Sequence, residues 1–419
     1  MSIIAFLSPL PPAETGIASY AAAVLDGLRE IGVADRHRID PIWPVDHDAK
    51  RRVREADVAV YQLGNNVEFH GDIYRLSVEH PGVTVLHDLA LDGLMWGLGV
   101  ERSPLAGPAR AEAIAAVPPG ATFGFPLNVP WCAQAVRRSR AVIVHSRFAR
   151  DYLVRIGCRT PVVVAPHPIV ETAEAVDRAR ARSADLHERL VAGDEVVVGI
   201  AGDLNASKGI AETIAALEQL PPTIRLLLVG RTGPHWQVDP VVRESRMADR
   251  VTVVKDPSDD DFLAWLCAVD VLVNVRHPHR GETSGSLVRA LQLGIPTIVS
   301  AIGSYLDVPD DIVGRIPPGP PDPAALAASI GPLAADASAR AAMGDRARAY
   351  ASEAFAPRVT AEAYASAIDG VLALAVDLRR LALARWAGAL RSTGVEPGDA
   401  ARGFGLRYAE GLAELGHPI

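Results

Sequence analysis

RHPHRGETSGSLVRALQLGIPTIVSAIGSYLDVPD (residues 276–310) contains the turn, helix and strand that decide the fold. Before the turn, VLVNV (residues 271–275) is a short apolar run, as is typical of a buried parallel strand. After the turn, Thr283, Ser284 and Ser286 are hydroxyl residues of the kind that cap a helix, and the apolar stripe in residues 287–293 predicts a helix that Gly294 and Pro296 end. The stretch therefore predicts a strand, helix and strand unit of an α/β domain.

The start of this helix predicts an anion site. The first backbone N–H groups of a helix lack internal partners and carry the positive end of its dipole, so a phosphate could bind there. Glu282 stands directly before the helix, and its carboxylate would repel a phosphate unless it binds something else, such as the hydroxyls of a sugar. The spacing fits equally well a capped structural helix whose dipole Glu282 favours.

The first 168 residues alternate strands with helices in the same way. Strands are predicted at 3–7, 56–63, 83–86, 141–144 and 162–164, and helices at about 17–31 and 147–156. Strands that alternate with helices indicate a doubly wound parallel sheet. We therefore expect an N-terminal Rossmann-like domain at residues 1–168.

Candidate ligand residues follow these strands, because the carboxyl ends of strands line the ligand crevice of an open α/β sheet. By this rule Gly16, Asn65, Asn66 and His87 lie on one edge of the sheet. Gly16 could equally form a structural turn, and His87 could be a histidine hydrogen-bonded at a strand end. Asp88 either orients His87 or caps the next helix.

Residues 99–130, rich in Pro, Gly and Ala, form either an acceptor-binding loop or a long connection.

A second α/β series begins after a charged, alanine-rich connection at 169–193 that contains a helix. Strands are predicted at 196–201, 225–230, 251–254 and 271–275, and helices at 210–220, 323–335 and 337–350. The section 359–391 is long enough for two helices. We expect a second Rossmann-like domain at 169–355 and C-terminal helices at 356–419.

Lys208 stands at the start of the predicted helix 210–220, where a cation does not favour the helix dipole. Its position indicates an external anion, unless the side chain simply extends into solvent. Arg231 follows the strand at 225–230 and so lies at the same kind of strand end.

Composition excludes several classes of protein. A chain of 419 residues, 49% hydrophobic and 22% charged, is long enough for two packed domains and is not disordered over most of its length. The net charge of −8 argues against a general binder of nucleic acid or of anionic membranes. We expect a small-molecule partner.

The three cysteines, Cys132, Cys158 and Cys267, are far apart and have no metal spacing, which is typical of core residues in a reducing compartment. The first residues lack the basic region of a signal peptide, and no stretch is apolar over the roughly 18 residues of a membrane span. A cytoplasmic protein without an integral membrane segment is expected.

No metal site is expected. The acidic run Asp259, Asp260 and Asp261 precedes an apolar helix, and we interpret it as a helix start. His277 and His279, separated by a proline, are expected in a loop. No cofactor is expected.

Together these stretches resemble the family 4 glycosyltransferases, retaining enzymes of the GT-B fold. The resemblance covers about residues 1–370 and rests on six motifs in the family's order: the loop 9–16, the strand ending in His87 and Asp88, VIVHS at 142–146, GDLNASKG at 202–209, LLLVG at 226–230, and residues 281–310. It implies an α/β protein with two Rossmann-like domains facing a cleft and a C-terminal helix that partly crosses back. It also implies transfer of a hexosyl or related group from a nucleotide sugar to an acceptor, without metal.

The resemblance assigns three catalytic residues. Lys208 would neutralise the diphosphate, Glu282 would hold hydroxyls of the donor sugar, and His87 would contact that sugar from across the cleft. Backbone N–H groups would bind the diphosphate from Thr283, Ser284, Gly285, Ser286 and Leu287. Gly16 and Ile17 would approach the donor phosphate or the acceptor. The other donor-side residues are Asp203, Arg231 and Arg289, and the acceptor-side residues are Asn65, Asn66 and Asp88.

Two positions depart from the family's pattern. Many members carry a basic residue near Asp203 and a glutamate, which grips the nucleotide ribose, in the place of Arg289. We hypothesise that the two changes compensate and that Asp203 and Arg289 pair across the site.

Two other functions fit the sequence: a catalytically silent nucleotide-sugar-binding or scaffold protein of the same fold, and a related enzyme such as a nucleotide-sugar epimerase or a phosphorylase. The sequence does not identify the donor sugar, the nucleobase, the oligomeric state or the acceptor, which could be a small molecule, a glycan or a lipid-linked group.

Overall fold

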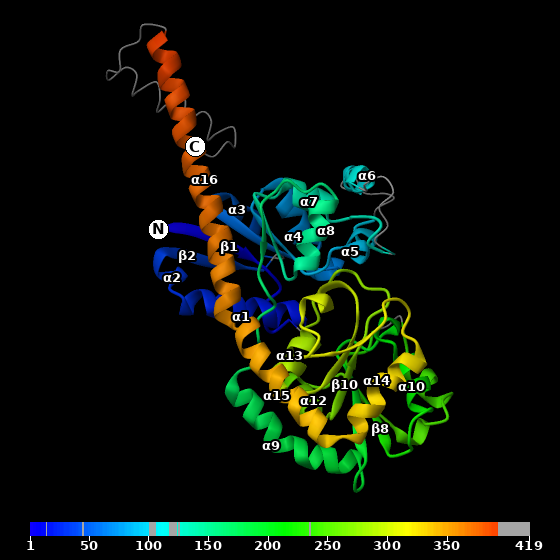
Figure 1. The fold of residues 1–419 in the computed structure, drawn as a ribbon. Helices are drawn as coiled ribbons and strands as arrows, with labels where there is room; N and C mark the ends of the chain where they lie inside the picture. The colour runs from blue at the N-terminus through cyan, green and yellow to red at the C-terminus, as the bar shows by residue number, and fades with distance from the viewer. Residues whose placement is uncertain are drawn as a thin grey trace. The chain divides into compact units, whose positions relative to one another are not determined.

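The computed structural model describes residues 1–13, 15–43, 46–99, 106–116, 124, 126–233 and 236–392, with the side chains of 106–109, 114 and 376–392 left aside. One compact unit, Met1–Ala365, contains two parallel six-stranded sheets (Figure 1). A second unit begins at Ser366. The expectation of an α/β fold with two Rossmann-like sheets is confirmed.

The first sheet has the strand order β2-β1-β3-β4-β5-β6, and every neighbouring pair is parallel. Its strands are β1 Ser2–Leu7, β2 His37–Ile42, β3 Val58–Leu63, β4 Val83–Leu86, β5 Ala141–Val144 and β6 Val162–Val164. Leu63, Leu86 and Val144 are register partners at the carboxyl ends of β3, β4 and β5. The residues that follow these strands are therefore brought together at one edge.

The second sheet has the order β12-β11-β10-β7-β8-β9 and is also parallel throughout. Its strands are β7 Val196–Ala201, β8 Ile224–Gly230, β9 Val251–Lys255, β10 Val271–Asn274, β11 Thr297–Ser300 and β12 Gly314–Ile316. β7 lies in the middle, between β8 and β10, so the loop after β7 adjoins the loops after both neighbours.

Helices connect the strands. In the N-terminal half they are α1 Gly16–Glu30, α2 Val33–Arg36, α3 Ala49–Glu55, α4 Val67–Glu79, α5 Asp92–Gly97, α6 Ala106–Ala116, α7 Ala133–Arg138 and α8 Arg147–Arg155. They continue as α9 Ala173–Leu190, α10 Ile210–Leu217, α11 Val238–Arg243, α12 Asp259–Cys267, α13 Gly285–Leu293, α14 Pro323–Ala335, α15 Ala337–Ala354 and α16 Pro357–Ser392. Three short 3₁₀ turns are η1 Ala206–Lys208, η2 Ala248–Arg250 and η3 Gly303–Asp307.

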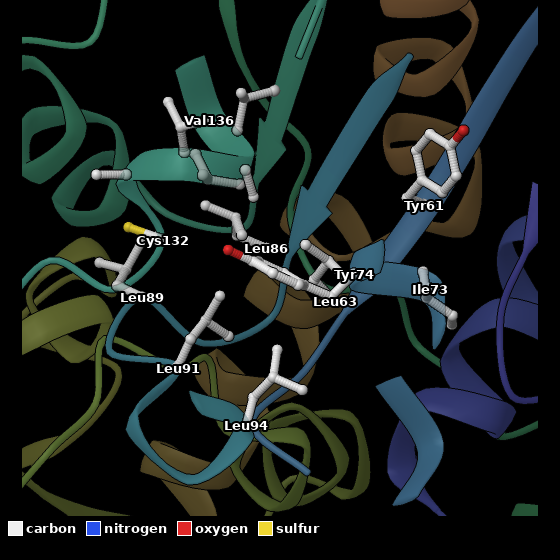
Figure 2. Packing of buried hydrophobic residues seen from close by; sticks show 14 of the residues in the cluster. Tyr61, Leu63, Ile73, Tyr74, Leu86, Leu89, Leu91, Leu94, Cys132 and Val136 are labelled. Carbon is white, nitrogen blue, oxygen red and sulfur yellow. The ribbon is translucent and has the colours of Figure 1, made fainter. Parts of the chain in front are cut away.

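The buried faces of the strands form the cores. Figure 2 shows the apolar cluster beside the first sheet, where Tyr61 and Leu63 of β3 pack with Tyr74 of α4 and Leu86 of β4. Cys132 belongs to this core, and burial raises the pKa of its thiol to about 12. It is therefore a packing residue, as expected.

The sequence did not predict strands β2 and β12, and the expectation of two helices in residues 359–391 is wrong. β2 contains a proline and two charged residues and lies at the edge of its sheet, where proline is tolerated; β12, the other missed strand, is only three residues long and also lies at an edge. The section expected as two helices is the single helix α16, because after Pro357 it contains no further proline and is rich in Ala, Leu and Arg.

The first turns of α16 contact the N-terminal half within the unit Met1–Ala365. The Thr360 hydroxyl donates to the carbonyl of Pro166 at 2.7 Å, and the hydroxyls of Tyr364 and Tyr20 lie 2.9 Å apart. The domain boundaries at 168/169 and 355/356 stay predictions. The expected loop at 99–130 lies partly, and residues 393–419 lie wholly, outside the described residues.

Candidate functional site

The loop between β10 and α13 is held by the cap of the helix. The Ser284 hydroxyl accepts from the Leu287 N–H at 3.2 Å and from Asn274 Nδ2 at 2.9 Å. The N–H groups of Gly285 and Ser286, at the start of α13, donate to no other residue in the described ranges. These two groups are available to an anion. The N–H of Leu287 serves the cap instead.

Lys208 is buried beside this helix start. Its side chain is 3% exposed, and its Nζ donates to the Ala201 carbonyl at 2.6 Å. The Ser286 hydroxyl donates to the same carbonyl at 3.2 Å. Gly202 passes close to both groups, since a Cβ there would lie 2.6 Å from Ser286 Oγ and 3.0 Å from Lys208 Nζ, and its φ is +101°. The structure therefore brings together two site residues that the sequence places 78 positions apart.

The ammonium group of Lys208 lacks a direct counter-charge. No carboxylate in the described part of the chain lies within ion-pair distance of Nζ. Burial, followed by repulsion from Arg276, lowers the pKa of Lys208 well below its usual value, although attraction to Asp203 and Glu282 opposes this. An anion bound at the start of α13 would restore the charged form.

Glu282 faces cationic and polar groups. Its Oε1 lies 3.0 Å from Arg276 Nε, and its Oε2 accepts from the backbone N–H of Arg280 at 2.6 Å. A small pocket adjoins the carboxylate, and its other walls are Arg276, His279, Ile302, Gly303, Ser304 and Tyr305. The carboxylate is thus oriented by the protein and stands at the wall of a polar hollow.

The side chain of His87 is engaged within the N-terminal half. Its Nε2 lies 2.8 Å from the Gln62 amide and its Nδ1 lies 3.2 Å from His145 Nε2. The expected contact of His87 with a sugar would therefore involve its backbone or require one ring bond to break. Burial, followed by the neighbouring His145, lowers the pKa of His87 well below its usual value.

The residues expected on the acceptor side make hydrogen bonds within the protein. The Asn65 N–H donates to Asp88 Oδ2 at 3.0 Å, its Nδ2 donates to Asp92 at 2.8 Å, and its Oδ1 accepts from Leu94 N at 3.0 Å. Asn66 caps α4 through the Glu68 N–H.

Asp88 is the titratable member of this group. Burial, followed by repulsion from Glu282, raises the pKa of Asp88 to about 7.

Arg280 joins the loop after β10 to α5. Its Nε lies 3.0 Å from Asp92 Oδ1, and its carbonyl accepts from the N–H groups of Leu89 and Ala90 at 2.9 and 3.1 Å. The backbone N–H of Arg280 also donates to the Glu282 carboxylate. Arg280 therefore links Asp92 to Glu282.

The expected pairing of Asp203 with Arg289 is wrong. Asp203 accepts from Arg231 at 2.9 Å, and both side chains are exposed. Arg289 donates to Glu171 at 2.5 Å, and its guanidinium lies 5.9 Å from the centre of the Phe262 ring. The reason is geometric: Arg289 lies one helical turn into α13, on the side that faces the connection from β6 to α9.

Three expected residues remain: Gly16 and Ile17 at the start of α1, and Thr283 before α13. Gly16 begins α1, where Thr15 caps the N–H of Ile17 at 3.1 Å. The Ile17 side chain lies against Gly64, since a Cβ at that glycine would be 2.5 Å from Ile17 Cδ1. Thr283 precedes the cap of α13.

The site also contains residues that the sequence reasoning missed. They are Tyr20, Gln62, His145, His167, Glu171, Arg276 and Arg280. His145 and His167 follow β5 and β6, so the strand-end rule applied to every strand would have found them. Tyr20 and Gln62 lie within regular elements and give no such signal.

Within the described ranges, no group of three or more His, Cys, Asp or Glu side chains is arranged to hold a metal ion. No helix in the same ranges is both long and apolar enough to cross a membrane.

Known proteins resemble the chain in sequence. Residues 195–336 match the family model described as "Glycosyl transferases group 1". A D-inositol 3-phosphate glycosyltransferase from Xylanimonas cellulosilytica is 32% identical over 229 residues, which cover 52% of this chain and 54% of the relative. The chain thus spans about half the length of this curated relative.

Solved structures resemble the chain in fold. Anabaena Alr3699/HepE in complex with UDP and glucose has a TM-score of 0.61 at 16% identity and covers 88% of this chain and 100% of its own. Sucrose-phosphate synthase from Thermosynechococcus elongatus has a TM-score of 0.61 at 18% identity, with 92% and 100% covered. At these identities the likeness shows the fold, which is the expected GT-B arrangement of two Rossmann-like sheets with a C-terminal helix.

Proposed function

Because residues 195–336 match the family model described as "Glycosyl transferases group 1", we propose that the protein transfers a glycosyl group from a nucleotide sugar to an acceptor. The observation that carries this proposal is the buried Lys208, which stands beside the free N–H groups of Gly285 and Ser286 without a direct counter-charge. A cationic side chain beside the N-terminus of a helix can bind the negatively charged oxygens of a diphosphate.

The proposed mechanism stabilises the leaving group. As the bond between sugar and diphosphate breaks, negative charge develops on the departing phosphate oxygens. Lys208 and the first turn of α13 are already in position to stabilise that charge as it forms. Burial strengthens their electrostatic effect. Glu282, oriented by Arg276 and Arg280, would accept hydrogen bonds from sugar hydroxyls. The acceptor would approach from the side of Asn65, Asn66 and Asp88.

We propose a retaining reaction that needs no metal. In this reaction the acceptor hydroxyl attacks the face from which the diphosphate leaves and passes its proton to the departing phosphate oxygen, so no enzyme nucleophile is required. Proton NMR of the first product formed by transfer or slow donor hydrolysis distinguishes retention from inversion. Activity that persists in EDTA supports the metal-free proposal, and full loss that Mg²⁺ or Mn²⁺ reverses contradicts it. A cytoplasmic location is part of the proposal, supported by three unpaired cysteines.

A binding screen tests the function. UDP-glucose and ADP are the first ligands to try, because the Anabaena protein was solved with UDP-glucose and the Arabidopsis starch synthase IV with ADP. An inositol phosphate is a reasonable first acceptor, since the curated relative is named for that substrate. Thermal stabilisation by a nucleotide sugar, followed by transfer or slow hydrolysis, is the expected result.

A matched pair of variants makes the screen specific. Lys208→Ala should weaken diphosphate binding about 100-fold, since a charge-assisted bond contributes about 3 kcal/mol. Lys255→Ala removes an exposed lysine paired with Asp239 and should leave binding unchanged. Equal affinity in both variants contradicts the role of Lys208. Nucleotide binding without transfer or hydrolysis over a wide acceptor panel would instead favour a catalytically silent binder.

A further inference from the structure

Three histidines surround Tyr20 at the carboxyl edge of the first sheet. His87 follows β4, His145 follows β5 and His167 lies after β6. Their ring centres lie 4.7, 5.0 and 5.1 Å from the centre of the Tyr20 ring. Tyr20 is fully buried, so these imidazoles gather in a site where each ring must find its partners inside the protein.

The partners of this cluster come from two further elements. Gln62, fully buried on β3, lies 2.8 Å from His87 Nε2 through its side-chain oxygen, and its amide nitrogen lies 3.1 Å from the Tyr364 hydroxyl. Tyr364 lies in the first turns of α16, and its hydroxyl is 2.9 Å from that of Tyr20. A chain of side chains thus connects α16 to His87.

The directions of the hydrogen bonds in this series of side chains follow from His145 and its partner, the Ala165 carbonyl. The carbonyl of Ala165 can only accept, so His145 Nδ1, at 2.9 Å, carries the proton. Burial lowers the pKa of His145 to about 4, so this ring is neutral near pH 7 and its Nε2 has a free lone pair. His87 Nδ1, 3.2 Å away, must then be the donor to it.

The direction at Gln62 is then decided. A neutral His87 with its proton on Nδ1 has a lone pair on Nε2 and needs a donor there. The oxygen of Gln62 cannot donate, and leaving it beside Nε2 would require a charged imidazolium at His87 or His145 in a buried site. A half-turn of the amide exchanges its oxygen and nitrogen without changing its shape, and it satisfies every bond: Tyr20 donates to Tyr364, Tyr364 to Gln62, and Gln62 to His87.

Other titratable groups agree with a neutral cluster. His70 of α4 donates from Nδ1 to the Gln62 carbonyl at 3.0 Å, and burial lowers its pKa to about 4. His167 donates to the Pro168 carbonyl at 2.8 Å, and burial followed by His145 lowers its pKa to about 3. No carboxylate of the described residues is hydrogen-bonded to any of the three histidines around Tyr20.

We propose that Gln62 is a positioning residue that donates its amide N–H to His87 Nε2, while Tyr364 and Tyr20 hold the amide in that orientation. The role of the positioned histidine rests on the proposed glycosyl transfer. The bond from Gln62 holds the imidazole ring of His87 in place. It thereby holds the backbone turn of His87 and Asp88 at the end of β4, where Asp88 accepts from the Asn65 N–H. Tyr364 makes the first turns of α16 part of that support.

A spectrum of the unmodified protein tests the hydrogen bonding without any enzyme assay. In ¹⁵N-histidine-labelled protein, two-bond ¹H–¹⁵N correlations, assigned by backbone-to-ring transfer, report which ring nitrogen carries the proton. His87 should show a protonated Nδ1 and a bare Nε2, unchanged between pH 6 and 8. A protonated Nε2 in the unmodified protein overturns the proposal.

Two variants link the bonding to function. Gln62→Glu replaces the donor by an acceptor, so His87 should acquire a proton on Nε2, and the pH profile of kcat/KM between pH 6 and 8 should change from that of the unmodified protein. Tyr364→Phe keeps the ring but frees the amide, and should lower kcat/KM about tenfold, the size expected for one hydrogen bond.

The matched control is Tyr74→Phe, which removes another buried tyrosine-to-glutamine bond, to Gln134 at 2.6 Å, outside the cluster. It should lower the melting temperature comparably and leave kcat/KM within about twofold. Equal losses of kcat/KM in both Phe variants overturn the positioning role. Absence of transferase activity in the unmodified protein counts against the proposed function, whereas the spectra still decide the bonding.

Discussion

Nε of Arg289 lies 2.5 Å from Oε1 of Glu171, and the two side chains are only 18% and 20% exposed. The pair connects α13, which begins at the proposed diphosphate site, to the segment before α9. Gln292 adds a second link, since its amide donates to the Glu171 carbonyl at 2.8 Å. The connection from β6 to α9 is therefore held against the helix that the proposed function uses.

Removing Glu171 should destabilise the protein. Glu171→Gln leaves a partly buried guanidinium without its carboxylate, so we expect the free energy of unfolding to fall by about 1–3 kcal/mol. Urea unfolding measures this change. The control is Glu362→Gln, which breaks the exposed pair with Arg358 and should change the free energy by less than about 1 kcal/mol. Equal effects would show that the Arg289 pair is no stronger than a surface pair.

Changes at Asp203 and Arg289 should be independent. Since their side chains have different partners, the effects of Asp203→Ala and Arg289→Ala on nucleotide affinity and stability should add to within about 0.5 kcal/mol in the double variant. Titration calorimetry and urea unfolding of the four proteins measure this. A coupling above about 1 kcal/mol would restore the idea of a reciprocal pair.

Lys208→Met should increase stability while it weakens binding. The pKa of Lys208 is lowered by burial, so below about pH 10 the unfolded state binds more protons, and this residue makes stability rise with pH. Met removes that effect, so its gain in melting temperature should be largest near neutral pH and shrink toward pH 10. Melting curves from pH 6 to 10 test the sign; a loss of stability at every pH contradicts it.

Binding of a nucleoside diphosphate should take up protons. The anion favours the charged form of Lys208, whose pKa then rises toward its usual value. Calorimetry in buffers of different ionisation enthalpy should show a net uptake of protons at pH 8 that is absent in Lys208→Met. The same uptake in both proteins would assign it to another group.

Asp88 should make stability fall between pH 4 and 7. Its folded pKa of about 7 exceeds the usual 3.8, so the folded state binds more protons in this range and unfolding becomes easier as pH rises. Asp88→Asn should therefore stabilise the protein at pH 8 more than at pH 5, by a difference on the order of 3 kcal/mol. Asp345→Asn, at an exposed carboxylate on α15, should show no such trend in melting curves.

Breaking the pair of Asp92 and Arg280 should weaken donor binding. Because Arg280 also positions Glu282, Asp92→Asn should raise the donor Kd or KM about tenfold, a change of about 1.4 kcal/mol. Asp40→Asn breaks a comparably buried pair with Arg52 and should leave donor affinity unchanged. A similar loss in both variants would mean that Asp92 acts through general stability.

Much of the fold could be predicted from local patterns. The apolar runs 83–86, 141–144, 162–164 and 196–201 are strands with these bounds, and α13 ends at Gly294 in the left-handed conformation, as expected. Short sequence patterns are enough to predict such elements, because the spacing of apolar residues and the conformational freedom of glycine act over only a few residues. The edge strand β2 has no such signal, because an edge tolerates charges and proline.

The sequence by itself determined that Glu282, the start of α13 and Lys208 belong to strand-end loops of an α/β protein, because each follows a recognisable strand. Only the tertiary structure decided the partners. Lys208 turns inward to the Ala201 carbonyl, Arg289 meets Glu171, and His87 is held by Gln62 and His145. Side-chain pairing depends on which loops adjoin and on which way each chain points at the end of its strand. Packing over the whole unit Met1–Ala365 sets both the positions of these loops and the directions of these side chains.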